Sequence, residues 1–532
     1  MKELWKIVSK KMYVYCITLG ILYTLADYGQ SFVLAHYGTN PFTMDKIVYL
    51  SIWIVWLDVA KLFLGKIDSY FENVNNVQTQ NTIKKYYFNK VQAMTMDKIA
   101  NTHTGYIHSL ISNIAFYFVD LIWQFQVSVI PIVIGGTSIL YMMCKQSIIT
   151  GLICIVISGL AVYSKYELLK DKKVTQKAAT EAMSKYNATF VDFVQNIVAV
   201  KKLNIVGFGN RKLDEYSEKY LVATKADEVK RSNANFAFTG LMNLLYVAVF
   251  VSTVFMVKNG RDGLPYLLFY MTALGKLYGN LNSLVRLFDI QSRFKTTKEQ
   301  LDDYFADNIQ YKVIEKFDNI KLINTEFSYT ENSTQIKIPE FVLEKGDKVS
   351  IMGESGQGKT TVMNILAGLY PLKKGNLYID GKECKNSRID VVFVSQEVEL
   401  FDFSIRDNLC LGKDIPEGKI MELFEDAGLS KWYSELPQGL ETLVGEKGVK
   451  LSAGQKQRLN IIRGILMDKE YYFFDEPTSN LDALSEEKIT NMIEKYLKNK
   501  TFVIVTHRPK LKELCNKHYI FEEHQMREIA VV

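Results

Sequence analysis

The chain has 532 residues, of which 48% are hydrophobic and only nine are proline, so two to four domains are expected and the apolar content is high for a soluble protein. Residues 1–315 hold 34 Lys and Arg against 24 Asp and Glu, whereas residues 316–532 hold 30 against 34. A basic excess in the apolar half favours a membrane protein over a nucleic-acid binder, and six cysteines without a close pair indicate neither a zinc site nor a disulfide framework.

The first 290 residues have the pattern of a helical membrane domain. Residues 1–11 predict a short amphipathic helix at the membrane surface, and residues 12–290 predict a transmembrane domain. The lysine-rich start also resembles a signal peptide, but no small-residue cleavage site follows it. Six apolar stretches are long enough to cross a hydrocarbon core of about 30 Å: 12–36, 46–70, 113–143, 147–168, 235–258 and 264–290.

The segments between these spans indicate orientation. Residues 71–112 and 169–234 are long and rich in lysine, which predicts that both segments and both termini face the cytoplasm. Apolar residues recur at helical spacing through both, so the spans are expected to continue as helices beyond the membrane. Turns are predicted near Asn101–Gly105 and Gly207–Asn210, each presenting a short transverse segment.

Charged residues inside the expected spans are costly and therefore mark candidate cargo contacts. The candidates are Asp27, Asp58, Asp120 and Lys276, together with the aromatic residues Tyr266, Phe269 and Tyr270. The acidic members favour a cargo with a cationic group that enters a water-filled cavity. The alternative is structural, because Asp58 and Lys61 lie at helical spacing and are expected to pair on one helix face.

Beyond a linker expected at residues 291–315, the pattern changes. Residues 316–532 alternate short β-rich runs with helical segments, which predicts a parallel sheet covered by helices. Within them GESGQGKT, residues 353–360, follows one such run, precedes a helical segment, and matches G-x-x-x-x-G-K-[ST]. The glycines let backbone N–H groups approach phosphates, so Lys359 is expected to reach the β and γ phosphates and Thr360 to bind Mg²⁺.

A second element, YYFFDEP, predicts a buried strand that ends in two carboxylates. Asp475 would face the magnesium ion, and Glu476 would act on the attacking water as a general base.

LSAGQKQRLN, residues 451–460, resembles the signature sequence of ATP-binding cassette (ABC) proteins, with LVGEKG before it. Other residues match the family's motifs in order: Tyr329 the aromatic that stacks on adenine, Gln396 the glutamine between the lobes, Asp482 the D-loop aspartate, and His507 the switch histidine. The whole chain resembles a half-size ABC exporter. The fold class implied is an all-α six-helix transmembrane domain with long intracellular helices, followed by an α/β P-loop ATPase (ABC) domain.

The resemblance also implies ATP and Mg²⁺ as cofactors and a set of site residues. Glu476 and His507 are the expected catalytic residues, and Thr360, Gln396 and Asp475 the expected magnesium ligands. ATP binding is expected from Tyr329, Gly353, Ser355, Gly356, Gly358, Lys359, Thr360, Thr361, Gln396, Ser452, Gly454, Gln455 and Asp482. Ala453 replaces the first of the family's paired glycines, and the added methyl group is expected to lower the rate.

An obligate dimer in the lipid bilayer is implied as well, because Ser452 and Gly454 of one subunit would complete the ATP site of the other. The intact motifs favour a homodimer, and a heterodimer with an altered chain is the alternative. The expected location is a bacterial plasma membrane, with the nucleotide-binding domain in the cytoplasm.

The expected function is ATP-driven export of an amphiphilic solute, peptide or lipid by alternating access. One alternative is an importer of chelated metal with the same fold, and another is an ATP-gated or regulatory membrane subunit. A soluble cassette ATPase acting on nucleic acid conflicts with the six spans, so no nucleic-acid partner is expected.

Overall fold

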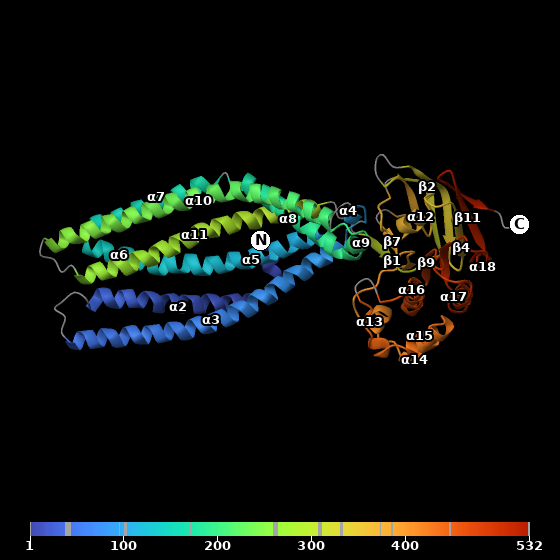
Figure 1. Cartoon of the computed structure of the whole chain (residues 1–532), viewed down its shortest axis with the longest axis horizontal. Helices are drawn as coiled ribbons and strands as arrows, with labels where there is room; N and C mark the ends of the chain where they lie inside the picture. Colours follow the sequence, from blue (N-terminus) through green and yellow to red (C-terminus); the bar gives the residue numbers. More distant parts are fainter. Residues whose placement is uncertain are drawn as a thin grey trace. The chain divides into compact units, whose positions relative to one another are not determined.

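A computed structural model describes residues 2–37, 44–94, 96–100, 104–170, 172–258, 264–306, 311–329, 334–372, 374–384, 387–445, 448 and 450–529. The chain divides into two compact units, Met1–Gln92 with Asn101–Asp307, and Ala93–Ala100 with Asn308–Val532. The first unit is helical, and the second combines a sheet with helices (Figure 1). The predicted fold class, a helical domain with apolar helices followed by an α/β domain, is confirmed.

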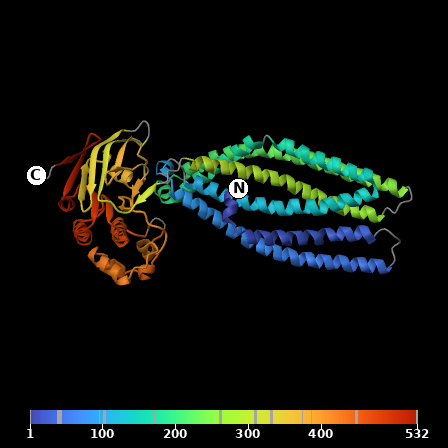
Figure 2. The same cartoon turned by 180° about the vertical axis from the view of Figure 1, so that it is seen from behind.

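Long helices make up the first unit. In chain order they are α1 (Lys2–Ile7), α2 (Lys10–Tyr37), α3 (Met44–Gln92), α5 (Thr104–Pro131), the π-helix η1 (Ile132–Gly136), α6 (Thr137–Gln146), α7 (Ile148–Lys170), α8 (Lys172–Gln195), α9 (Ile197–Lys202), α10 (Val206–Lys258) and α11 (Leu264–Phe305). The two opposite views in Figure 1 and Figure 2 show α2 beside α3, α5 beside α11, and α7 beside α10.

The six expected spans fall within these helices, except that Ser147, the first residue of the fourth span, precedes α7. Among the described residues, four helical stretches are long and apolar enough to cross a membrane: Met44–Gln92, Gly105–Cys144, Ile148–Lys170 and Val206–Phe255. α2 and α11 are not among them, because tyrosines and Asp27 lower the hydropathy of α2, and Lys276 and Asn280 lower that of α11. These polar residues contact one another across the two helices: Asn280 bonds to Tyr28, and Lys276 pairs with Asp27.

One expected turn lies a few residues earlier, and the expected linker begins as a helix. The turn expected at Gly207–Asn210 comes earlier, since these residues already belong to α10 and the chain reverses after α9, where Asn204 has a φ of 51°. The expected linker, residues 291–315, is helical up to Phe305. α11 continues there because Phe294 and Leu301 are buried in a core cluster with residues of α3 and α5.

The other expected turn, Asn101–Gly105, has a short helix before it, α4 (Met96–Ala100), while α5 already begins at Thr104. Residues 101–103 lie outside the described residues. Although α4 stands between α3 and α5 in sequence, it belongs to the second unit, where the Met96 N–H donates to the Leu369 carbonyl oxygen at 2.8 Å.

A close contact joins α2, η1 and α11. The ring of Tyr28 covers Gly135 so closely that a Cβ atom there would lie 1.9 Å from the ring. Asn280 of α11 donates a hydrogen bond to the Tyr28 hydroxyl. The π-helical turn after Pro131 therefore places a glycine where a tyrosine from another helix needs room.

The second unit is built on one sheet. After α4 its elements are β1 (Lys312–Ile314), β2 (Asn319–Phe327), β3 (Ile336–Glu344), β4 (Lys348–Gly353), α12 (Lys359–Leu366), β5 (Lys374–Ile379), β6 (Lys382–Glu383), β7 (Ser387–Ile389), β8 (Val392–Val394), α13 (Ile405–Cys410), α14 (Glu417–Asp426), α15 (Ser430–Ser434), the 3-10 helix η2 (Gly439–Glu441), α16 (Ala453–Met467), β9 (Tyr471–Asp475), α17 (Ala483–Tyr496), β10 (Thr501–Val505), α18 (Pro509–Glu513), β11 (Lys517–Glu522) and β12 (Gln525–Ile529).

Among the described residues, ten strands form this sheet in the order β6-β5-β2-β3-β12-β11-β4-β10-β9-β8, and β1 pairs with β7 apart from it. The strands β11, β4, β10, β9 and β8 are parallel neighbours. Tyr471 and Phe473 of β9 enter the core on one face of the sheet, while Tyr472 and Phe474 enter the core on the other. This burial on both faces explains the uninterrupted apolar run. The parallel pairing brings the carboxyl ends of β4, β9 and β10 to one edge of the sheet.

Candidate functional site

The phosphate loop predicted from GESGQGKT lies between β4 and α12. Gly353 has a φ of 136° and Gly358 a φ of 116°, values that favour glycine. Space requires glycine too, because a Cβ at Gly353 would lie 2.6 Å from the Phe521 carbonyl oxygen and one at Gly358 2.8 Å from the Ile336 side chain. The loop is therefore folded so that the backbone, rather than side chains, lines the start of α12.

Two residues at the start of α12 reach in different directions. Lys359 is buried, and its Nζ donates to the carbonyl oxygens of Gly353 at 2.6 Å and Glu354 at 2.8 Å. The ammonium group therefore lies against the loop that would bind a phosphate. Burial lowers the pKa of Lys359 from its usual value. Thr360 instead donates from Oγ1 to Oδ2 of Asp475, at 2.8 Å.

Asp475 ends β9 and is buried, which raises its pKa above the usual aspartate value. Together the Thr360 hydroxyl and the Asp475 carboxylate present hard oxygen donors of the kind that Mg²⁺ prefers. Among the described residues, no group of three or more His, Cys, Asp or Glu side chains could hold a metal ion. A Mg²⁺ ion held by a hydroxyl and a carboxylate takes its other ligands from water and substrate phosphates.

Glu476, the next residue, has a φ of 45°, which is uncommon for a glutamate and strains the backbone by about 1–3 kcal/mol. Its N–H donates to the Val505 carbonyl oxygen at 3.0 Å, which fixes the turn against β10. The Gln396 side chain donates from Nε2 to Oε2 of Glu476 at 2.9 Å. The structure thus joins Thr360 to Asp475 and Gln396 to Glu476, four predicted site residues from three separate segments.

Sequence reasoning missed one residue that holds this arrangement, Gln457. It is buried, donates from Nε2 to the Glu476 carbonyl oxygen at 3.0 Å, and accepts the Asn480 N–H on Oε1 at 3.1 Å. The signature sequence contains it, but only the fold shows that one amide ties α16 to the turn after β9.

The signature residues begin α16. Ser452 is the N-cap: its Oγ accepts the Gln455 N–H at 3.2 Å, and its own N–H donates to Oε1 of Gln455 at 2.8 Å. A Cβ at Gly454 would lie 3.5 Å from the Asn480 carbonyl oxygen, so this glycine lies against the segment that leads to Asp482. Asp482 in turn caps α17, accepting the N–H groups of Leu484 and Ser485 at 3.1 and 3.0 Å.

The remaining predicted residues lie around this edge. The hydroxyl oxygens of Tyr329 and Thr361 are 2.8 Å apart. Tyr329 is 37% exposed, so part of the residue is open to a planar group. Ser355 and Gly356 are exposed in the phosphate loop, and His507 is exposed after β10.

In the helical unit, three of the four predicted cargo residues join one charge network. Lys61 contacts the Asp27 carboxylate at 3.0 Å, and Lys276 contacts it at 3.2 Å. Gln30 donates to Asp58 at 2.5 Å, while Lys61 lies 3.8 Å from Asp58. The structural alternative, a pair between Asp58 and Lys61, is therefore present but secondary to the contact between Lys61 and Asp27.

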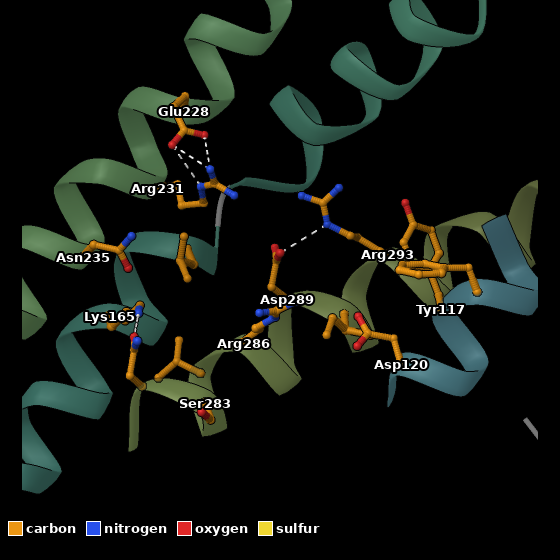
Figure 3. A pocket seen from close by; sticks show the side chains of 15 residues that line it. Tyr117, Asp120, Lys165, Glu228, Arg231, Asn235, Ser283, Arg286, Asp289 and Arg293 are labelled. Carbon is orange, nitrogen blue, oxygen red and sulfur yellow. Dashed lines mark hydrogen bonds and ion pairs between the residues drawn. The ribbon is translucent and has the colours of Figure 1, made fainter. Parts of the chain in front are cut away.

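Asp27 and Lys276 also line a cavity of about 420 Å³, together with Asp68, Glu72 and Gln126. Asp120 instead lines a separate cavity of about 710 Å³ between α5, α7, α10 and α11 (Figure 3). Phe269 and Tyr270 are buried in the core of the helical unit, and the side chain of Tyr266 lies outside the described residues.

The larger cavity contains charges that sequence reasoning overlooked. Lys165, Arg286 and Asp289 all line it, and all fall inside expected spans. All three lie in the last turns of those spans, where charges are common, so their position in the sequence did not indicate a shared cavity.

Comparisons with known proteins come from sequence and from fold. The profile described as ABC transporter matches residues 336–479. The chain is 32% identical over 255 residues to the ATP-dependent lipid A-core flippase of Photobacterium profundum, covering 45% of this chain and 44% of the relative. It is 29% identical over 378 residues to the mitochondrial iron-sulfur clusters transporter ATM1 of Candida glabrata, covering 66% of this chain and 51% of the relative. The chain thus spans about half the length of these two relatives.

A solved structure titled "Structure of a bacterial Atm1-family ABC exporter with ATP bound" matches with a TM-score of 0.82 at 19% identity. The match covers 97% of this chain and 93% of that chain, so the two share a fold over nearly their whole length.

Proposed function

We propose that this chain, which has the fold of a half-size ABC exporter and carries an ABC transporter domain, is one half of an ATP-driven exporter. The observation that carries the proposal is the arrangement at one edge of the sheet. Beside the phosphate loop, Asp475 bonds to Thr360 and Glu476 bonds to Gln396, each at less than 3 Å. Two adjacent carboxylates held by different partners suit two different roles.

In this proposal the loop from Gly353 to Gly358 and the side chain of Lys359 hold the phosphates of ATP. Thr360, Asp475 and the Oε1 atom of Gln396 hold Mg²⁺, which when bound neutralises charge on the phosphate oxygens. The remaining ATP contacts come from Tyr329, Ser355, Gly356, Thr361, Gln455 and Asp482, with Tyr329 against the adenine.

Glu476 is the proposed general base. Because the peptide turns sharply at this residue, its carboxylate lies next to the Gln396 amide, beside the proposed magnesium ligands. His507, exposed after β10, is the second proposed catalytic residue.

The working unit in this proposal is a dimer, with Ser452 and Gly454 of one subunit against the γ-phosphate of ATP bound to the other. Both residues lie at the N-terminus of α16, where the helix dipole favours an anion. Since every catalytic motif is usable in this chain despite Ala453, the dimer we propose is a homodimer.

α4 supports mechanical coupling between hydrolysis and the helical unit. It is joined to α3 and α5 by short segments yet belongs to the second unit, so a displacement of that unit would move the ends of both helices. We propose that ATP binding and hydrolysis drive alternating access in this way, with the second unit and both termini on the cytoplasmic side of a bacterial plasma membrane.

The test is the ATPase activity of the purified full-length chain in lipid nanodiscs, compared with Glu476→Gln protein. The panel of added compounds contains peptides, lipids and charged amphiphiles. Hydrolysis that depends on Glu476 and rises with one class of compound supports the proposal. ATP binding without any hydrolysis would refute a self-sufficient homodimer.

A further inference from the structure

The cavity between α5, α7, α10 and α11 has a volume of about 710 Å³, which suits a small organic molecule. Seven charged residues line it: Asp120, Lys165, Glu228, Arg231, Arg286, Asp289 and Arg293 (Figure 3). Four of them are basic and three are acidic, so the lining has a positive excess at neutral pH.

Two of the basic residues are already paired. Arg231 contacts Glu228 at 2.6 Å on the same helix, and Arg293 contacts Asp289 at 3.2 Å. Figure 3 shows both pairs as dashed lines. Within the described part of the chain, neither Lys165 nor Arg286 has a carboxylate oxygen within 4 Å. Asp289 acts on Lys165 and Asp120 acts on Arg286 only from beyond that distance, so these two bases lack an ion pair in direct contact.

Lys165 is only 6% exposed, so its ammonium group is largely removed from water. Its Nζ donates to Oδ1 of Asn282 at 2.7 Å and lies 4.9 Å from the centre of the Phe238 ring. An amide oxygen and a ring stabilise an ammonium ion less than a carboxylate would. Burying a charge without a counter-charge in direct contact is unfavourable, and Asp289 acts on Lys165 only from a longer distance. A negatively charged ligand in the cavity would supply that counter-charge.

Arg286 differs from Lys165 in exposure. Its side chain is exposed, and it lies on α11 one turn beyond Asn282, the acceptor for Lys165. A guanidinium group offers a planar pair of donors that matches a carboxylate or a phosphate. Asn235 and Ser283 add neutral hydrogen-bonding groups to the same lining.

The smaller cavity provides a contrast. Its charged lining is Asp27, Asp68, Glu72 and Lys276, three acids and one base. Its lysine already contacts Asp27 at 3.2 Å. An anion would meet repulsion there, so the two cavities in the helical unit differ in the charge that they favour.

We propose that the larger cavity binds the anionic group, a carboxylate or a phosphate, of the transported molecule, with Lys165 and Arg286 as its counter-charges. This inference rests on the proposed export function insofar as the bound molecule is the cargo. It is an alternative to the expectation of a cationic cargo, since Asp27 and Asp58 have partners within the chain and Asp120 lines a cavity with more bases than acids.

The experiment measures binding of two soluble dyes to full-length protein in phosphatidylcholine nanodiscs, without ATP, by fluorescence anisotropy. Carboxyfluorescein and rhodamine 123 have the same xanthene core and opposite charge. Carboxyfluorescein should bind, and Lys165→Gln and Arg286→Gln should each weaken it about 10- to 100-fold, as expected for a lost hydrogen bond to a charged group. Arg286→Lys, which keeps the charge, should weaken it less than Arg286→Gln.

Two controls separate charge from damage to the fold. Lys219→Gln removes a paired base of α10 that does not line the cavity, and should change carboxyfluorescein binding less than about 3-fold. Arg286 is exposed, so its replacement leaves the core intact even if Lys165→Gln lowers stability. The proposal is overturned if wild-type protein does not bind carboxyfluorescein, if rhodamine 123 binds more tightly, or if the variants weaken both dyes equally.

A competition experiment with an anionic lipid identifies the source of the anionic group. Phosphatidylglycerol added to the nanodiscs should compete with carboxyfluorescein if the anionic group belongs to a lipid, and should leave binding unchanged if it belongs to a soluble molecule. Dye binding needs no ATP hydrolysis, so the two proposals can fail separately. If the protein binds carboxyfluorescein but has no Glu476-dependent ATPase activity, the proposed function is wrong and the assignment of the cavity stands.

Discussion

The two units of this chain place their charged residues in different ways. In the second unit, the carboxylates of Asp475 and Glu476 come from one strand end, and their partners follow other strands at the same edge of the sheet. In the helical unit, Asp27 contacts Lys276, which is 249 residues away in sequence.

This difference affects what can be inferred from residue type alone. A site built at strand ends carries its geometry in short motifs, because a strand, a tight loop and a helix start fix the positions of a few consecutive residues. A charge within a helical bundle has no fixed partner until the helices have packed. If the charges at the strand ends serve catalysis, their loss should change ATP hydrolysis. If the charges in the helical unit serve the fold, their loss should change stability.

The largest effect is expected for Glu476→Gln. Loss of the proposed base should lower the ATPase rate about 10²- to 10⁴-fold and leave ATP binding in place, since the amide keeps the size of the side chain. Phosphate release and nucleotide binding are measured on the same preparation. Glu487→Gln, at an exposed residue of α17, is the matched control. Normal hydrolysis in the Glu476 variant would remove this residue from the proposed mechanism.

Lys359→Ala should come next. Its Nζ lies along the loop that would hold the phosphates, and a hydrogen bond to a charged group contributes about 1.5–3 kcal/mol. The Kd for ATP should therefore rise roughly 10- to 150-fold in a fluorescent-nucleotide titration. Lys382→Ala, at an exposed lysine of the same unit, should leave the Kd unchanged. Equal effects of both substitutions would contradict a specific phosphate contact.

Asp27→Asn tests the structural role of the charge network. Without this carboxylate, Lys61 and Lys276 lose their shared partner in a partly buried site, which should reduce the free energy of unfolding by about 1–3 kcal/mol. The melting temperature in nanodiscs should fall, whereas exposed Asp45→Asn should not change it. Lys276→Gln should reduce the free energy of unfolding less in the Asp27→Asn variant than in the wild-type protein. Strict additivity of the two substitutions would mean that the ion pair contributes nothing.

The smallest effect is expected for Ala453→Gly, which restores the paired glycines of the signature. Removing one methyl group at an exposed helix start should raise the ATPase rate by about 5-fold or less, equivalent to about 1 kcal/mol. Ala453→Ser adds an atom instead and should lower the rate. The same direction of change for both variants would show that side-chain size at this position is not what limits turnover.

Most of the second unit could be predicted from sequence, because its signals are local. The glycines of the phosphate loop, the buried run before Asp475 and the cap at Ser452 each specify a backbone conformation within a few residues. What could not be predicted were contacts across the unit, such as the bond from Gln396 to Glu476 and the two bonds of Gln457.

In the helical unit, sequence predicted where helices lie but not how side chains pair. The six apolar stretches predicted helices where the described residues have them, whereas the helical course of residues 291–305 depends on the burial of Phe294 and Leu301 against other helices. Lys165 and Arg286 lie close to the ends of expected spans, where charges are common, so their shared cavity became visible only in the fold.

Gln457 has a consequence for a pair of such chains. One of its amide atoms contacts the peptide that carries Glu476, and the other contacts the segment before Asp482, while its own helix begins at Ser452. In the proposed dimer, Glu476 acts on one nucleotide and Ser452 contacts the other. A single buried side chain then links the two ATP sites within each subunit, and the sites would sense each other's occupancy and hydrolyse ATP cooperatively.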